Sequence, residues 1–215
     1  MIIDCISDLH GFFPELSGGD LLIVAGDLTA RDSLVEHYQF GDWLKQPNYK
    51  KKVVIAGNHD GRLEELGIVP SDNYFHCSSY LCDSGTEFEG LKIWGTPWTK
   101  TFPGINPKCC AFTCDTEEEL DIKFSLIPDD TDILISHGPF LHILDQNYDG
   151  YACGSPALRD AVDRVKPKLF ICGHIHEQGG NQLMYKHSGP NTWCVNCSYV
   201  NERYNPVNKP VRIIL

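Results

Sequence analysis

The sequence predicts an α/β fold with mixed β-sheets. Short apolar runs that end in polar turns recur along the 215 residues, as expected for buried strands. Segments that begin with helix N-cap signals and continue with apolar residues at helical spacing lie between some of these runs. We find no internal repeat, low-complexity tract or linker long enough to separate domains, so we expect one domain over residues 1–215.

Apolar and alternating patterns locate the expected strands. Glu87–Glu89 alternates before Gly90 and Leu91–Trp94 alternates after it, which predicts an antiparallel hairpin. Strand-like patterns also occur near the C-terminal end, at Trp193–Cys197 and Val211–Leu215. Buried strands are predicted by apolar runs at Ile2–Ile6, Leu21–Ala25, Val53–Ala56, Ile133–Ile135 and Leu169–Cys172.

Three helix starts are predicted, at Ser33, Thr116 and Ser155. The first two open a capping box with a Glu three residues later, and the third is followed by a Pro suited to the first helical position. The stretches 96–115 and 138–154 predict long loops, the first because of its Pro and Cys residues. Loops of this length often form lids or binding walls.

Composition argues against several classes of function. The 18 Lys and Arg against 29 Asp and Glu give a net charge of −11, which repels nucleic-acid backbones and anionic lipid. No apolar run approaches the roughly 18 residues of a membrane span. We therefore expect no general nucleic-acid binding and no membrane association.

Cysteine usage bears on the cellular compartment. The chain has ten cysteines, and the competing interpretations are a secreted disulfide framework or reduced thiols in the cytosol. The N-terminus shows no basic leader or cleavage site, and Cys5 and Cys172 lie in apolar strand-like runs. These observations favour reduced thiols and a cytoplasmic location.

Side chains able to bind metal ions follow five of the predicted strands. In α/β sheets, ligands collect beyond the carboxyl ends of the strands, so these residues are expected to meet. Mixed carboxylate, amide and imidazole ligands suit a first-row transition ion. The five motifs are Asp8-x-His10, Gly26-Asp27, Gly57-Asn58-His59-Asp60, His137-Gly138 and Gly173-His174-x-His176.

Each motif alone is common as a turn or a helix cap, but all five in this order indicate one site. Seven candidate ligands exceed what one tetrahedral ion needs. A carboxylate that bridges two ions is the economical solution, and Asp27 is the natural bridge. Such ions, about 3.5–4 Å apart, clamp a phosphoryl group and lower the pKa of a bridging water.

This order of motifs resembles the calcineurin-like metallophosphoesterase superfamily over nearly the whole chain. Four segments further resemble its metallophosphoesterase-domain-containing (MPPED-type) branch, which is related to class III cyclic nucleotide phosphodiesterases: Val54–His59, Trp94–Trp98, Thr131–Pro139 and Lys166–Leu169. The resemblance implies a sandwich of two mixed β-sheets flanked by helices, in four αββα layers. Mammalian members of that branch carry Gly at the position of His174, so the His in this chain implies an intact site.

The resemblance also implies roles for the candidate residues and two divalent transition-metal ions, with Mn²⁺ expected and Fe, Zn, Co or Ni as alternatives. One ion would be held by Asp8, His10, Asp27 and His176, and the second by Asp27, Asn58, His137 and His174. His59 would lie beside the phosphate and stabilise or protonate the leaving oxygen. Asn58 and His59 are also candidate substrate contacts, as is Trp98 on the loop after Pro97.

The expected function is hydrolysis of small phosphate diesters such as cyclic nucleotides, with a metal-bridging hydroxide as the nucleophile. A diester is favoured because only Arg31, Arg62 and Lys100 lie near the motifs to bind the second charge of a monoester. A phosphomonoesterase that uses the same site and a non-catalytic scaffold of the same fold are the alternatives, and the complete ligand set favours an enzyme. The expected partner is a small phosphate ester, and a homodimer is compatible with the sequence.

Overall fold

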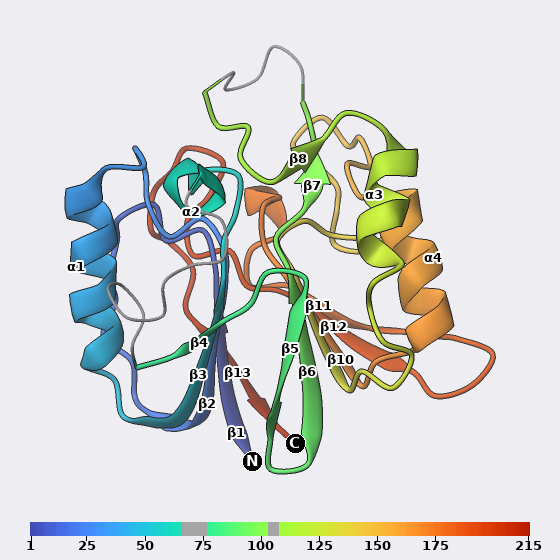
Figure 1. Cartoon of the computed structure of the whole chain (residues 1–215), viewed down its shortest axis with the longest axis horizontal. Coiled ribbons are helices and arrows are strands. Elements are labelled where there is room, and N and C mark those ends of the chain that lie inside the picture. Colours follow the sequence, from blue (N-terminus) through green and yellow to red (C-terminus); the bar gives the residue numbers. More distant parts are fainter. Residues whose placement is uncertain (66–76, 103–107) are drawn as a thin grey trace.

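Two mixed β-sheets pack face to face, and helices cover both outer faces, in the computed structural model of the chain (Figure 1). The structure describes residues 1–65, 77–102 and 108–215. One cluster of buried apolar side chains lies between the sheets, and one lies under the helices on each side. This arrangement of layers confirms the sandwich that the family resemblance implies.

The first sheet has the strand order β13-β1-β2-β3-β4. Its neighbours from β1 to β4 are parallel, and β13 pairs antiparallel with β1. The strands are β1 (Ile2–Ile6), β2 (Gly19–Ala25), β3 (Tyr49–Ile55), β4 (Ser79–Tyr80) and β13 (Val211–Ile214).

The second sheet has the strand order β11-β12-β10-β9-β6-β5. Its four inner strands are parallel, and antiparallel strands close both edges. The strands are β5 (Ser84–Phe88), β6 (Leu91–Thr96), β9 (Ile133–Ser136), β10 (Leu169–Cys172), β11 (Gln182–Tyr185) and β12 (Thr192–Asn196). A separate two-stranded ladder joins β7 (Thr99–Lys100) and β8 (Thr113–Cys114).

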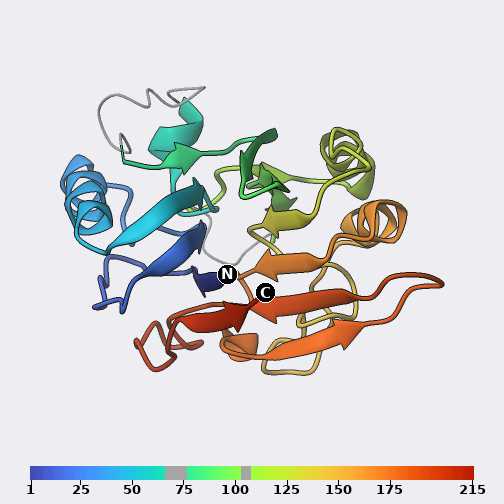
Figure 2. The same cartoon turned by 90° about the horizontal axis from the view of Figure 1, so that it is seen from below.

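The helices divide between the two outer faces, and Figure 2 shows α1 on one side of the sheets and α3 with α4 on the other. The helices are α1 (Leu34–Lys45), α2 (Gly61–Glu65), α3 (Glu117–Phe124) and α4 (Pro156–Val165), with a 3₁₀ turn at His176–Gln178. The predicted start signals are confirmed, because Ser33 and Thr116 close capping boxes and Ser155 caps α4. None of the described helices is both long enough and apolar enough to cross a membrane.

Alternation of buried side chains along the strands produces the layers. Ile3 and Ile23 of the first sheet face Ile135 of the second across the space between the sheets. Leu22 points the other way, into the cluster under α1, and Phe170 points into the cluster under α3 and α4. Because both faces of central strands such as β2, β9 and β10 are buried, these strands read as continuous apolar runs.

Some elements were not predicted from the sequence. Strand β3 begins at Tyr49, before the expected start at Val53, because Lys50–Lys52 continue the pairing with β2 despite their charge. The stretch 96–115, expected to be a loop, contains the short strands β7 and β8. Strands β4, β7 and β8 and the five-residue helix α2 are too short for their apolar residues to show a periodic pattern. Strand β11 lies at an edge of its sheet.

Gly95 in β6 tests how closely the sheets pack. A Cβ at this position would lie 2.6 Å from Cγ2 of Ile55 in the first sheet and 2.6 Å from Cβ of Leu81. We predict that Gly95→Ala lowers the free energy of unfolding by about 1–3 kcal/mol, because an overpacked core has to shift. Denaturant unfolding measures this, and Glu87→Ala on exposed β5 should change it by less than about 0.5 kcal/mol. Equal free energies of unfolding for Gly95→Ala and Glu87→Ala would contradict this packing.

Candidate metal centre

The polar motifs converge beyond the carboxyl ends of five parallel strands. Three of these strands belong to the first sheet and two to the second, so both sheets contribute side chains. The residues that meet are Asp8 and His10 after β1, Asp27 after β2, Asn58 after β3, His137 after β9, and His174 and His176 after β10. The structure therefore brings together the seven candidate ligands.

A first group of ligand atoms comes from Asp8, His10, Asp27 and His176, whose atoms all lie within 4.8 Å of one another. The Nε2 atoms of His10 and His176 are 3.3 Å apart. Nε2 of His176 lies 3.2 Å from Oδ1 of Asp8, and Nε2 of His10 lies 3.7 Å from Oδ2 of Asp27. Atoms bound to one ion at about 2.1 Å lie roughly 3.0–3.4 Å from one another, so this group could hold a metal.

A second group forms around the amide oxygen of Asn58. This oxygen lies 3.0 Å from Nε2 of His137 and 2.9 Å from Nδ1 of His174. The side-chain amide nitrogen of Asn58 donates to the carbonyl oxygen of Cys109 at 3.1 Å. Because a carbonyl oxygen can only accept, this bond sets the orientation of the Asn58 side-chain amide. Oδ1 of Asp27 lies 3.3 Å from Nε2 of His137, so the two oxygens of Asp27 face different groups.

The hydrogen bonds of His137 indicate that a positive charge belongs in the second group. Nδ1 of His137 lies 3.0 Å from the carbonyl oxygen of Ala25, so Nδ1 carries the proton. In a neutral imidazole, Nε2 then directs a lone pair at the oxygens of Asp27 and Asn58, which is repulsive. A proton or a metal ion at Nε2 removes this repulsion, and the donor set suits a transition ion.

The charge states of the buried groups suit metal binding. Burial lowers the pKa of His10 to about 4 and that of His174 to about 3, so both imidazoles are neutral near pH 7. Burial opposes ionisation of Asp27, but the neighbouring His137 holds the pKa of this carboxyl well below its usual range. Burial also opposes protonation of His137, but Asp27 raises its pKa to about 9. Neutral imidazoles and ionised carboxylates are the forms that ligate metals, so His10, His174 and Asp27 are in the ligating form, whereas an ion at His137 would displace the proton on Nε2.

The backbone is strained at four of the candidate ligands. Asp8, His10, Asp27 and His174 have φ values of 51°, 43°, 52° and 66°. Left-handed conformations of this kind cost on the order of 1–3 kcal/mol each and persist where surrounding contacts impose them. Strain of this kind collects at functional sites, which agrees with the convergence of side chains here.

Buried side chains impose these conformations by binding the turns. The Asp60 carboxylate accepts from the amides of Leu28 and Gly57, and so joins the turns after β2 and β3. The side-chain amide nitrogen of Asn196 donates to the carbonyl oxygen of Gly173 at 3.2 Å, in the turn after β10. These bonds position the backbone that carries the candidate ligands.

Two glycines allow the carboxylates to approach the neighbouring turns. A Cβ at Gly57 would lie 2.3 Å from Oδ1 of Asp27, and a Cβ at Gly173 would lie 2.2 Å from Oδ2 of Asp8. Any other residue at these two positions would displace a carboxylate or the turn itself.

His59 lies beside the two groups of ligand atoms, and neither group includes one of its nitrogens. Its backbone amide donates to Oδ1 of Asp27 at 2.9 Å. Its Nδ1 lies 3.5 Å from the carbonyl oxygen of Ala30 and 3.5 Å from Sγ of Cys109. The side chain is therefore placed next to the site without contributing to its donor set.

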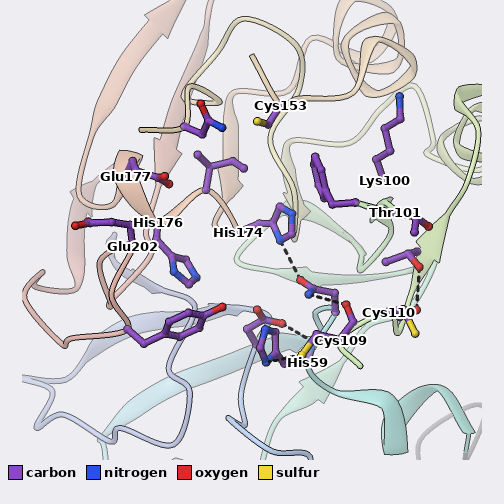
Figure 3. Close-up of a pocket in the computed structure, with 17 residues that line it drawn as sticks. His59, Lys100, Thr101, Cys109, Cys110, Cys153, His174, His176, Glu177 and Glu202 are labelled. Carbon is purple, nitrogen blue, oxygen red and sulfur yellow. Dashed lines mark hydrogen bonds between the residues drawn. The ribbon is translucent and has the colours of Figure 1, made fainter. Parts of the chain in front are cut away.

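A cavity of about 450 Å³ opens over the site (Figure 3). Its wall includes Asp27, Asn58, His59, His174 and His176 from the motifs. The two stretches expected to form binding walls, 96–115 and 138–154, both contribute residues to it. Residues of the motifs and of the two long stretches thus line the same cavity.

Trp98 lies outside the described wall of the cavity. Its Nε1 donates to Asp83 at 2.6 Å, and its ring packs edge-on against Phe112. We therefore do not retain Trp98 as a substrate-binding residue, because its polar and apolar surfaces are both used elsewhere.

Several residues of the wall carried no recognisable signal in the sequence. Phe102, Glu177, Glu202 and Tyr204 lie in irregular segments or in the 3₁₀ turn. The sequence indicates Lys100 only as a cation near the motifs. Figure 3 shows Glu177 and Glu202 on the side of His176, whereas Lys100 lies on the opposite side, beyond His174.

Comparisons with known proteins agree with the motifs. A sequence model of the calcineurin-like phosphoesterase family matches residues 1–178. Metallophosphoesterase domain-containing protein 1 from Homo sapiens is 33% identical over 238 residues, covering 98% of this chain and 70% of that protein. The UPF0046 protein C25E10.12 from Caenorhabditis elegans is 34% identical over 199 residues, covering 82% of this chain and 69% of that protein.

The fold also resembles solved structures. TT1561 from Thermus thermophilus superimposes with a TM-score of 0.60 at 14% identity, over 91% of this chain and 89% of that one. Another crystal structure superimposes with a TM-score of 0.65 at 12% identity, over 89% of each chain. At such low identity these likenesses support the fold alone.

Metal binding can be tested without an activity assay. Saturating Mn²⁺ should raise the Tm of chelator-treated protein by roughly 5–10 °C, because an ion that binds only the folded chain stabilises it by mass action. Asp27→Asn should lose most of this shift, since an amide cannot bridge two ions as a carboxylate does. Asp42→Asn, the same change on the exposed face of α1, should keep it. Equal shifts in the two variants would contradict the assignment of Asp27.

Proposed function

The chain belongs to the calcineurin-like phosphoesterase family, and on this premise we propose that it is a two-metal phosphodiesterase that hydrolyses small diesters such as cyclic nucleotides. The observation that carries the proposal is the Asp27 carboxylate, whose oxygens face two groups of ligand atoms, at 3.7 Å from His10 and 3.3 Å from His137. A two-metal centre needs a bridging ligand in this position.

We assign the first group of ligand atoms to one divalent ion and the second group to another, with Asp27 shared. Mn²⁺ is the proposed metal, and Fe, Zn, Co and Ni fit the same mixture of carboxylate, amide and imidazole donors. When bound, such a pair holds the phosphoryl group and lowers the pKa of a water molecule that serves as the nucleophile. All of the proposed ligands come from one chain, so the site needs no second subunit.

His59 is proposed to donate a proton to the leaving oxygen. It lines the cavity, and its backbone is tied to Asp27. Its Nδ1 lies 3.5 Å from both the carbonyl oxygen of Ala30 and Sγ of Cys109, and the side chain lines the cavity, where it can exchange a proton with the substrate. Asn58 is the second proposed substrate contact, since it also lines the cavity.

The charges around the cavity support a diester substrate. Among the described residues of the wall, Lys100 is the one Lys or Arg, and its Nζ lies 3.4 Å from Oε1 of Glu117. Glu177 and Glu202 add negative charge on the opposite side (Figure 3). A diester brings one negative charge, whereas the second charge of a monoester would meet carboxylates without an uncommitted cation.

A phosphomonoesterase is the alternative on the same site, and it would require Lys100 to leave Glu117. Arg31 and Arg62 lie outside the described wall of the cavity. Nε of Arg62 donates to the carbonyl of Asp32 at 2.6 Å, which holds this cation elsewhere. A non-catalytic scaffold is disfavoured because each group contains four potential ligands and His59 lies beside them.

A cytoplasmic location is part of the proposal. Burial raises the pKa of the Cys5 and Cys172 thiols well above the usual range, so both remain unreactive thiols inside the protein. Ten cysteines would stay reduced in the cytosol without the need for pairing.

The role of His59 predicts a separation of rate from metal content. His59→Ala should lower kcat by about 10²–10⁴-fold, the usual effect of losing a general acid, while both ions remain bound. Elemental analysis of the purified variant gives the metal content, and steady-state kinetics give kcat. A matched loss of metal and activity would show that His59 is a ligand instead.

Substrate preference tests the proposed function directly. With saturating Mn²⁺ after chelation, kcat/KM for bis-p-nitrophenyl phosphate should exceed that for p-nitrophenyl phosphate, because the described wall offers no Lys or Arg that is not already paired for the second charge. A monoester advantage of about tenfold, or about 1.4 kcal/mol, would overturn the diester assignment and leave the metal centre standing. Full activity in excess EDTA, with no metal bound, would contradict the two-metal proposal itself.

A further inference from the structure

Tyr204 reaches the candidate metal centre from the C-terminal segment, outside residues 1–178 that the family matches. A tight turn at residues 201–205 presents it. The Tyr204 amide donates to the carbonyl of Asn201 at 2.8 Å, and the side-chain oxygen of Asn201 accepts from the amide of Asn205 at 3.0 Å. The turn therefore determines where the Tyr204 side chain lies.

The backbone of Tyr204 is left-handed, with a φ of 58°, a conformation that bulky residues adopt rarely and at a cost. It brings the Tyr204 ring to 4.8 Å from the ring of His10, 5.1 Å from that of His176 and 6.2 Å from that of His59. Despite these contacts, 39% of Tyr204 is exposed, and the residue lines the cavity. Part of the surface of Tyr204 thus remains accessible to a ligand in the cavity.

Phe102 supplies a second aromatic wall. It follows β7, and its ring lies 5.6 Å from the ring of His174 with an angle of 31° between the planes. Tyr204 is therefore beside the first group of ligand atoms, and Phe102 is beside the second. Ile175 lines the same cavity, whose volume of about 450 Å³ exceeds what a phosphate group fills and suits an organic ligand.

Two roles for these rings make different predictions. Rings that only shield the histidines from water would support every substrate to the same extent. Rings that contact the substrate would favour substrates with a planar ring of their own, because aromatic side chains stack on such rings. Tyr204 is part of the cavity wall and stays 39% exposed, which supports the second role.

We infer that Tyr204 and Phe102 determine specificity for phosphate diesters that carry a planar aromatic ring, such as a nucleobase, on one ester arm. The inference rests on the proposed function, since the phosphate of such a substrate has to reach the proposed metal centre. It adds the part of the site that recognises the organic arm.

The kinetic test compares 2′,3′-cyclic AMP with ribose 2′,3′-cyclic phosphate, which has the same diester and no base. Tyr204→Ala should raise KM for cyclic AMP about tenfold and change kcat less than about threefold. For the base-free substrate, the same variant should change KM by no more than about twofold. Tyr204→Phe keeps the ring and should resemble the wild type, and Phe102→Ala should resemble Tyr204→Ala. Tyr38→Ala, at an exposed tyrosine of α1, is the matched control.

Calorimetry provides a readout that does not depend on turnover. The wild type should bind the slowly hydrolysed phosphorothioate analogue of 2′,3′-cyclic AMP about tenfold more tightly than Tyr204→Ala does. If binding depends on Tyr204 but cyclic AMP is not hydrolysed, the proposed function is wrong and the ring site stands. If Tyr204→Ala weakens ring-bearing and base-free compounds equally, or weakens neither, the inference is overturned whatever the activity.

Discussion

The buried carboxylate of Asp27 is the constraint on which the site depends. It is 2% exposed, and a buried carboxylate is costly unless hydrogen bonds and positive charge surround it. The His59 amide and the His137 ring approach one of its oxygens, and His10 approaches the other. Because Asp27 follows a strand of the first sheet and His137 follows a strand of the second, the packing of the two sheets sets this geometry.

The sandwich also explains how the strained turns survive. The strands that carry the candidate ligands are anchored by apolar side chains on both faces, so their ends are held before the turns begin. Asp60 then ties two of the turns together, and Asn196 holds a third. Stability thus comes from the cores, while the turns at the edge adopt left-handed conformations that a free chain would avoid.

The two kinds of residue around the cavity come from different parts of the fold. Strand ends supply the metal-binding side chains, whose positions follow from the sheets. Irregular segments supply Phe102 and Tyr204, and the short strand β7 supplies Lys100, and these residues form the wall that an organic substrate would meet. The division is a general one, since rigid scaffolds position chemistry and loops vary to set specificity.

The sequence by itself determined the long buried strands, the helix caps and the five motifs, because each depends on spacing within a short stretch of chain. It also indicated Asp27 as the bridge, from the number of candidate ligands alone. Only the tertiary structure decided that the two oxygens of Asp27 face separate groups, that Lys100 is paired with Glu117, and that Trp98 is turned away from the cavity. It also decided that Tyr204 lies beside His10, a residue almost two hundred positions earlier. Contacts between such distant segments depend on how the sheets and turns pack, and no local period in the sequence encodes them.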